Sequence, residues 1–328
     1  MRVAIIGQQA FGASVLEAFL ARGDEVAGVF CAPEKAGAKA DPLRLEAEKH
    51  GLKVFQFASL RGEDAEQALR ELNVDIGIMA YVLQFAPQSF VNIPRHGMLQ
   101  YHPSLLPAYR GPSAIGWSII KGEKQTGLSI FRPTDGLDEG PVVLQKTVDI
   151  GLEDTLGSVY FDKLFPQGVA AMLEAADLVM AGKHQEVVQD ESLAGYEGWC
   201  KDREAEIHWS QHLDQIHNLI RGCNPAPGAW TLVHGHKVRI YDCTRHVARR
   251  FGDVKGKPGE ICAIGDASIE ITVQGGRLEI HKVRADGAGK ISAADFARAE
   301  GLAVGDQFAS AAPQVSAAES LPKQGSIG

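Results

Sequence analysis

The sequence predicts an α/β protein with a mostly parallel sheet, followed by a small β domain. Short β-branched runs alternate with amphipathic stretches up to about residue 200, which is typical of a parallel sheet with helical crossovers. The pattern then changes near residue 202, and the later part contains short strands with period-two alternation. The length of 328 residues also suits two domains, each with its own core.

Apolar runs are predicted to be the strands of the first domain, and the amphipathic segments between them to be its helices. The strands are expected at residues 2–6, 26–31, 54–57, 76–80 and 98–101, and the helices at residues 11–20, 42–50 and 63–72. A helix at 113–121 and strands at 128–131 and 142–150 follow. Thr155 is expected to cap a long helix that reaches residue 181 and that Pro166 kinks or splits.

The second part of the chain is predicted to be a helix followed by short strands. The helix is expected at residues 207–221. Alternation over residues 268–274 and 277–281, joined by the pair Gly275-Gly276, predicts a hairpin with a tight turn. The resulting domain limits are 1–202 for the α/β domain, 203–309 for the small β domain and 310–328 for a flexible tail rich in Ala, Ser, Pro and Gln.

Composition and charge favour a cytoplasmic protein that does not associate with a membrane. Hydrophobic residues make up 45% of the chain and charged residues 23%, as in ordinary globular proteins. The N-terminal apolar run is too short for a signal sequence, and five cysteines without a CxxC pair do not suggest a disulfide framework. The net charge of −8 disfavours general binding to nucleic acid, because nucleic acid is a polyanion.

Three features that could bind cofactors or phosphates have simpler interpretations. The turn IIGQQAFGAS lacks GxGxxG and a Walker lysine, so we expect no nicotinamide cofactor there. His234 and His236 flank a predicted hairpin turn and have no third ligand at suitable spacing, so we expect no zinc site. The basic residues between Arg245 and Lys257 could bind phosphates, but a solvated loop is the default interpretation.

His102 and an acidic loop are the candidate catalytic elements. His102 follows the strand predicted at 98–101, and in an open α/β sheet ligands bind at the carboxyl ends of the strands. Asp135 and Asp138 lie in the loop PTDGLDEG after the strand predicted at 128–131, where aspartates could also serve only as turn residues. Because both loops are expected at the same edge of the sheet, an imidazole and a carboxylate could meet there.

These two loops closely resemble those of the folate-dependent formyltransferases. The resemblance rests on HPSLLPAYRGPSAIGW and DGLDEGPVVLQK and extends to about residue 305. The stretches KADPLRLEAEKHGLKVFQF, PRHGMLQYHPSLLP, LFPQG, YEG, IHNLIRG and PGAW are most similar to the N-terminal hydrolase domain of 10-formyltetrahydrofolate dehydrogenase, and methionyl-tRNA formyltransferase is also similar. The resemblance implies a Rossmann-like formyltransferase domain followed by a barrel-like (OB-like) β domain.

The resemblance also assigns roles to residues. His102 and Asp138 correspond to the family's catalytic histidine and aspartate, and Gln100 stands where most members have an asparagine. The substrate and formyl donor is expected to be 10-formyltetrahydrofolate, with no metal and no NAD(P). We expect no aldehyde oxidation, because 328 residues leave no room for the carrier and aldehyde dehydrogenase domains. The residues expected to bind the folate are Val82, Leu83, Phe85, Thr134, Asp135 and Gly136.

The formyl acceptor and the oligomeric state remain open at this point. In the expected mechanism, protonated His102 and the Gln100 amide stabilise a transient oxyanion, and Asp138 takes the proton of the attacking nucleophile. The nucleophile is expected to be water or a small amine. The alternatives are methionyl-tRNA, for which the basic stretch is the only compositional support, a nucleotide-linked amino sugar, and a catalytically silent folate-binding module.

Overall fold

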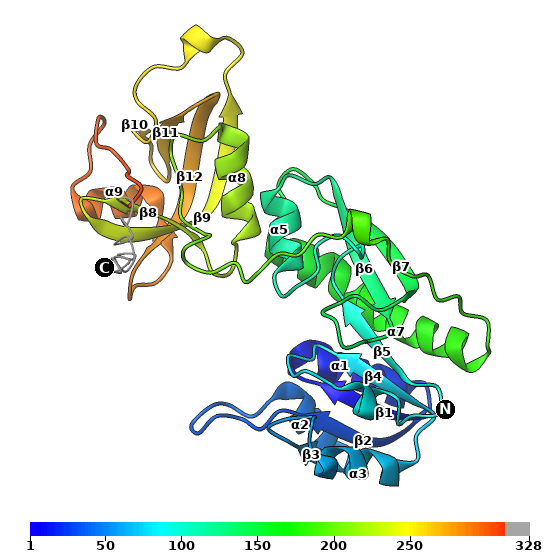
Figure 1. The fold of residues 1–328 in the computed structure, drawn as a ribbon. Helices are drawn as coiled ribbons and strands as arrows, with labels where there is room; N and C mark the ends of the chain where they lie inside the picture. Colours follow the sequence, from blue (N-terminus) through cyan, green and yellow to red (C-terminus); the bar gives the residue numbers. More distant parts are fainter. Residues whose placement is uncertain (312–328) are drawn as a thin grey trace, which may run out of the picture. The chain divides into compact units, whose positions relative to one another are not determined.

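The structure is a computed structural model that describes residues 1–311 (Figure 1). Its chain divides into two compact units. The first comprises Met1–Ala205 and His217–Gly228, and the second comprises Glu206–Ile216 and the described residues from 229 to 311. The tail predicted at 310–328 therefore lies, apart from its first two residues, outside the described part of the chain.

The first unit contains a seven-stranded sheet in the order β3-β2-β1-β4-β5-β6-β7. The first five strands along the chain pair in parallel, whereas β6 and β7 pair antiparallel, so the predicted mostly parallel sheet is confirmed. The strands are β1 (Arg2–Gly7), β2 (Glu25–Cys31), β3 (Val54–Gln56), β4 (Ile76–Ala80), β5 (Met98–His102), β6 (Gln125–Phe131) and β7 (Val142–Asp149).

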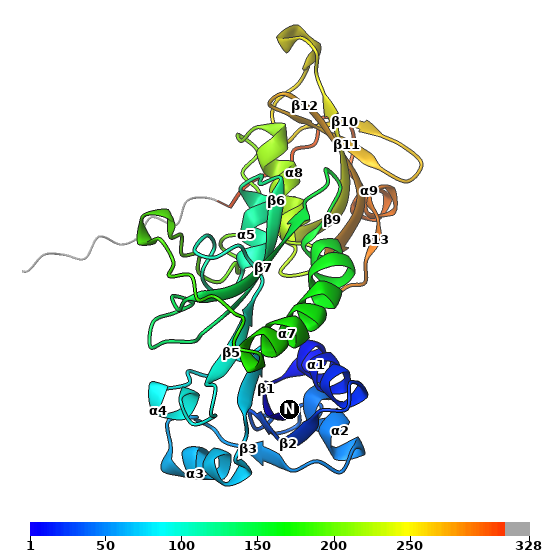
Figure 2. The same ribbon diagram turned by 90° about the vertical axis from the view of Figure 1, so that its right-hand side faces the viewer.

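Helices cover both faces of this sheet, and each face has its own core (Figure 2). Successive residues of a strand point to opposite faces, so Val3 and Ile5 of β1 join one core, while Ala4 and Ile6 join the other. The first core is covered by α1, α2 and α7, and the second by α3 and α4. The helices are α1 (Gln9–Ala21), α2 (Pro42–Lys49), α3 (Glu63–Leu72), α4 (Gln88–Val91), α5 (Ala114–Ile120), α6 (Leu156–Ser158) and α7 (Phe165–Met180).

The long helix predicted after Thr155 is split, as the proline in it suggested. Thr155 caps α6 through a capping box, in which its side chain accepts from the Ser158 amide. A π-helical segment, Val159–Leu164, then leads into α7, and Pro166 lies in the first turn of α7. A proline is tolerated there because the first-turn amides have no partner within the helix.

A short segment from beyond residue 202 returns to the first unit. The Gly157 amide donates to the Asn224 carbonyl at 3.0 Å, and the Arg221 guanidinium donates to the Asp154 carbonyl at 2.6 Å. Glycine is needed at 222, because a Cβ there would lie 2.7 Å from the Gly116 carbonyl oxygen. These contacts explain why residues 217–228 belong with the α/β unit.

The second unit is built on an antiparallel sheet in the order β10-β11-β12-β9-β8, with β13 paired to β12. Its two edges are joined by one segment near the end of the described chain, since Gln307 bridges to Glu260 beside β10 and Ala309 bridges to Leu232 of β8. This closure gives the barrel-like arrangement predicted. The elements are β8 (Ala229–Val233), β9 (His236–Val247), β10 (Ile261–Ile264), β11 (Ile269–Val273), β12 (Gly276–Ala285), β13 (Ile291–Ser292) and α9 (Ala293–Glu300).

Two local predictions in this second part have different outcomes. The hairpin around Gly275 is confirmed, because Val273 of β11 pairs with Gly276 of β12. The helix predicted at 207–221 is wrong at its start, since α8 spans Leu213–Gly222. The Ile207 amide instead donates to the Trp230 carbonyl at 2.8 Å, so backbone pairing with β8 overrides the helical pattern of the preceding residues.

Candidate active site

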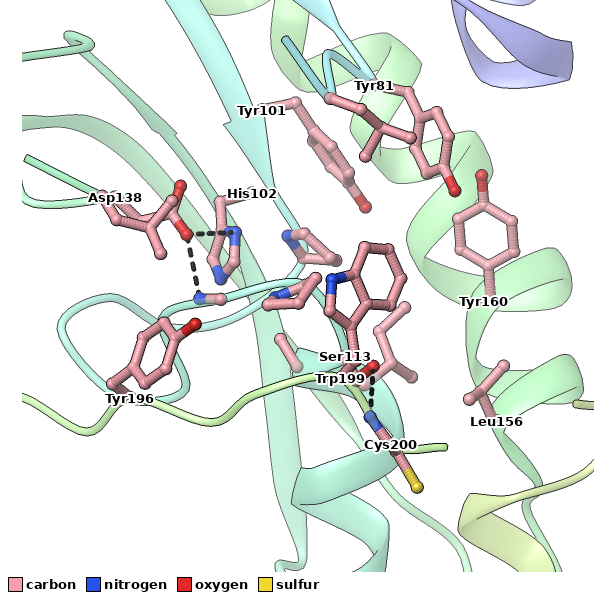
Figure 3. A pocket seen from close by; sticks show the side chains of 18 of the residues that line it. Tyr81, Tyr101, His102, Ser113, Asp138, Leu156, Tyr160, Tyr196, Trp199 and Cys200 are labelled. Atoms are coloured by element: carbon pink, nitrogen blue, oxygen red, sulfur yellow. Dashed lines mark hydrogen bonds and ion pairs between the residues drawn. The ribbon is translucent and has the colours of Figure 1, made fainter. Parts of the chain in front are cut away.

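A cavity of about 480 Å³ opens in the first unit at the carboxyl end of β5 (Figure 3). His102 is the last residue of β5, and the loop that follows it forms part of the cavity wall. The acidic loop between β6 and β7 forms another part, because Leu137 and Asp138 line the cavity. The expectation that this loop and the loop after His102 leave the same edge of the sheet is wrong: β6 pairs antiparallel with β5, so its last residue, Phe131, lies opposite Gln100 and the loop starts toward the amino end of β5. The loop therefore has to turn back along the sheet to bring Asp138 to His102. The predicted site residues that line the cavity are Val82, Leu83, Gln100, His102 and Asp138.

The His102 imidazole is buried, and its ring orientation is fixed by one backbone group. Its Nε2 lies 2.8 Å from the Tyr109 carbonyl oxygen. A carbonyl can only accept a hydrogen bond, so Nε2 carries a proton and donates. Nδ1 therefore faces the Asp138 carboxylate, with 3.5 Å between Nδ1 and Oδ2. That separation is too long for a strong hydrogen bond, so Nδ1 can also form a hydrogen bond to an atom of a substrate.

The Asp138 carboxylate is also buried and has a second partner. Oδ2 accepts a hydrogen bond from the Gly111 amide at 2.9 Å. The Asp138 backbone is left-handed, with φ of 56°, a conformation that aspartate tolerates better than most residues. Figure 3 shows the carboxylate pointing toward both the imidazole and the Gly111 amide. The sequence-based choice of Asp138 rather than Asp135 thus corresponds to the acid that lies beside His102.

Gln100 lies two residues before His102 on β5, and residues two apart share one face of a strand. It lines the cavity and is half-buried. Gln100 and His102 therefore border the same cavity. Gln100 thus lines the cavity at the position where the resemblance leads us to expect an asparagine.

The residues predicted to bind folate fall into two groups. Val82 and Leu83 line the cavity, in the loop that follows β4. Phe85 does not line it, and its ring instead lies 4.4 Å from the Arg61 guanidinium carbon. In the acidic loop the predicted residues Thr134, Asp135 and Gly136 also stand outside the lining, whereas the two residues after them form part of the wall.

Aromatic side chains that the sequence did not single out form much of the remaining wall. Tyr81, Tyr101 and Tyr160 gather on one side of the cavity (Figure 3). Burial raises the pKa of Tyr160 to about 12 and raises the pKa of Tyr101 further, so both phenols keep their protons at neutral pH. The adjacency of Tyr101 to His102 was the one sequence signal that could have indicated its position.

Residues 195–200, here called the strap, supply another part of the wall. The Arg110 amide donates to the Gly195 carbonyl at 2.7 Å, and the Cys200 amide donates to Ser113 Oγ at 3.1 Å. These bonds bring Tyr196 and Trp199 to the cavity although both are exposed. The sequence could not predict this wall, because it depends on backbone pairing between segments more than 80 residues apart.

The cavity lining contains few charged side chains. Among the described residues that line it, none is lysine or arginine, and Asp138 is the single carboxylate. Within residues 1–311 no group of three histidine, cysteine or acidic side chains has an arrangement that suits a metal ion. Nor does any helix within residues 1–311 have the length and apolar character needed to cross a membrane.

The chain matches two family models and several characterised proteins. Residues 1–175 match the formyl transferase family, and residues 200–301 match the formyl transferase C-terminal domain. Human mitochondrial 10-formyltetrahydrofolate dehydrogenase is 41% identical over 249 residues, which are 74% of this chain and 27% of the relative. The chain thus spans about a quarter of that relative's length.

Two further matches extend over most of the chain. Methionyl-tRNA formyltransferase from Geobacter metallireducens is 32% identical over 301 residues, which are 90% of this chain and 94% of the relative. The crystal structure of HypX from Aquifex aeolicus in complex with tetrahydrofolic acid has a TM-score of 0.65 at 20% identity. That comparison covers 90% of this chain and 47% of HypX, and at this identity it supports the fold alone.

Proposed function

Because the chain belongs to the formyl transferase family, we propose that it takes the formyl group from 10-formyltetrahydrofolate and releases it to water. The observation that carries this proposal is the buried His102–Asp138 pair in a cavity whose described lining includes no lysine or arginine. A phosphorylated acceptor needs such a side chain to neutralise it, whereas water or a small neutral amine does not.

The proposed reaction is a hydrolysis of the N10–formyl bond. A water oxygen attacks the formyl carbon, and negative charge develops on the formyl oxygen. Because the Nε2 proton of His102 is held by the Tyr109 carbonyl, the donor left for that oxygen is Nδ1–H of the protonated ring. The Gln100 amide is the second proposed donor, and a donor of this kind typically contributes about 3 kcal/mol.

Asp138 completes the proton transfers. Its carboxylate accepts a proton from the attacking water, in keeping with its position 3.5 Å from the imidazole. The carbon–N10 bond then breaks as Asp138 returns this proton to N10, which regenerates the carboxylate. The products are tetrahydrofolate and formic acid, which ionises to formate. The folate is proposed to lie near the predicted residues, of which Val82 and Leu83 line the cavity. The remaining proposed folate contacts are Phe85, Thr134, Asp135 and Gly136.

Formylation of methionyl-tRNA is the second candidate. It is favoured by the similarity to the Geobacter enzyme, which extends over nearly the full length of both chains. The basic stretch that would contact tRNA offers limited support, because Arg245 is paired with Asp214 and His246 lies 2.8 Å from Glu279. A side chain engaged with a carboxylate is less available to a phosphate.

One experiment separates these candidates. The protein is incubated with 10-formyltetrahydrofolate alone, with methionyl-tRNA and with a panel of small amines, and formate, formylated acceptor and tetrahydrofolate are measured. We expect formate and tetrahydrofolate in equal amounts without any acceptor. Tetrahydrofolate release that requires methionyl-tRNA would refute hydrolysis and establish the second candidate, and release that requires an amine would identify a small-molecule transferase.

A further inference from the structure

A buried amide lies behind the catalytic aspartate, on the side away from the cavity. Gln189 follows an extended segment that pairs with the start of β7, where Val187 and Val142 exchange backbone hydrogen bonds of 2.8 and 2.9 Å. Its side chain is only 7% exposed. Gln189 does not line the cavity, so it cannot contact a substrate there directly.

Gln189 holds the backbone of the acidic loop on both sides of its turn. Its Nε2 donates to the Asp138 carbonyl at 2.7 Å and to the Gly140 carbonyl at 2.7 Å. Both amide protons are therefore used. The loop backbone also packs closely against the end of β6 at this point, because a Cβ at Gly140 would lie 1.6 Å from the Arg132 carbonyl oxygen.

Arg110 fixes which way the Gln189 amide points. Its Nε and Nη2 donate to Gln189 Oε1 at 3.2 and 2.8 Å, and its Nη1 and Nη2 donate to the Glu191 carboxylate at 2.9 and 2.7 Å. A guanidinium can only donate, so the glutamine oxygen must face Arg110 and the NH₂ group must face the two carbonyls. Arg110 itself is only 6% exposed.

The backbone on either side of Arg110 contacts both catalytic side chains. The Tyr109 carbonyl accepts from His102 Nε2, and the Gly111 amide donates to Asp138 Oδ2. The same three-residue segment therefore touches the imidazole and the carboxylate, while the Arg110 side chain links it through Gln189 to the backbone of Asp138. The distance between the two catalytic groups depends on this closed ring of contacts.

We propose that Arg110 and Gln189 form a brace that positions Asp138 against His102, with Gln189 as a positioning residue. The brace is defined as the hydrogen bonds that join Arg110, Gln189 and the carbonyls of Asp138 and Gly140. The inference rests on the proposed function and adds a residue that acts through Asp138. Loss of the Gln189 amide leaves two carbonyls without their donor and frees the left-handed turn to relax.

The test compares two glutamines that hold the same loop at different points. Gln189→Met keeps the side-chain length and removes the donor. The matched control is Gln88→Met, because Gln88 Nε2 donates at 3.1 Å to the carbonyl of Pro133, which lies at the start of the loop. Gln189→Glu is the second variant, since it retains the partnership with Arg110 but presents an oxygen to the two carbonyls.

For both Gln189 variants we expect kcat to fall about 10- to 100-fold, with KM for 10-formyltetrahydrofolate within about twofold of wild type. Gln88→Met should keep kcat within about twofold. A loss that merely reflects loosening of the loop would appear in the control as well. The brace is overturned if folded Gln189 variants keep wild-type kcat, or if Gln88→Met loses as much.

A structural readout separates this inference from the proposed function. Crystal structures of the wild type and Gln189→Met give the His102 Nδ1 to Asp138 Oδ2 distance, which is 3.5 Å in the intact brace and should lengthen in the variant. This comparison requires no turnover. A wild type that produces no formate when water is the sole acceptor refutes the proposed function, whereas an unchanged distance in the variant refutes the brace alone.

Discussion

Replacing Asp138 by asparagine removes one negative charge from the cavity and keeps the shape of the side chain. The amide oxygen of the variant can still accept from the Gly111 amide, which lies 2.9 Å from Asp138 Oδ2 in the wild-type protein. The carboxylate that faces His102 Nδ1 at 3.5 Å is lost, and with it the group that we propose takes the proton of the attacking water. Asp138→Asn therefore separates the chemistry of this residue from its structural contacts.

The expected loss can be estimated from the proposed role of the carboxylate as a general base. General base catalysis typically contributes about 10²- to 10⁴-fold, which corresponds to about 3 to 5 kcal/mol of transition-state stabilisation. We expect kcat for formate release to fall within that range. Binding of tetrahydrofolate should change by less than about threefold, because an isosteric amide leaves the cavity wall in place.

The assay measures formate release in single turnovers and tetrahydrofolate affinity by calorimetry. Glu139→Gln is the matched control, since it neutralises the adjacent acid, which is exposed and does not line the cavity. The control should retain turnover within about twofold. Turnover of Asp138→Asn above one tenth of the wild-type rate would refute the role of Asp138 as the base, as would an equal loss in Glu139→Gln.

Two further predictions concern the framework around the site. Gly7→Ala should lower the free energy of unfolding by at least about 1 to 3 kcal/mol, because the added Cβ would lie 1.9 Å from the Ala80 carbonyl oxygen. The measurement is urea unfolding, and an unchanged unfolding midpoint would contradict this close packing. Hydrogen bonds from the Asp41 amide and the Gln56 side chain lower the pKa of Glu34 from 4.5 to about 2, so its stabilising effect should be complete above pH 4.5 and disappear as the pH falls toward 2. The stability difference between wild type and Glu34→Gln, measured by urea unfolding at several pH values, should narrow over that interval, and a difference independent of pH would rule out the Glu34 contribution.

The sequence predicted those features that depend on neighbouring residues along the chain. The Thr155 cap, the break at Pro166 and the turn at Gly275 each follow from local backbone preferences. His102 could be placed at the end of β5 because a buried strand and a following proline-rich loop are visible in the sequence. Local patterns were therefore enough to locate one half of the proposed catalytic pair.

The parts that could not be predicted depend on pairing between distant segments. Ile207 leaves the predicted helix because its amide pairs with Trp230, which no local pattern indicates. Gln189 reaches Asp138 across 51 positions, and its role is visible only once both carbonyls are placed. Phe85 stays a predicted folate contact, and the packing of its ring on Arg61, outside the cavity lining, is a further long-range contact that no local pattern indicates.

The most direct test of the proposed attack by water on the formyl carbon is to follow the origin of the formate oxygen. The wild-type protein is incubated with 10-formyltetrahydrofolate in ¹⁸O-labelled water, without any amine or tRNA, and the formate is analysed by mass spectrometry. Attack by water in the His102–Asp138 cavity predicts that enzyme-dependent formate carries one ¹⁸O atom and matches tetrahydrofolate in amount. No enzyme-dependent formate, or formyl release that begins only when an acceptor amine is added, would contradict the account.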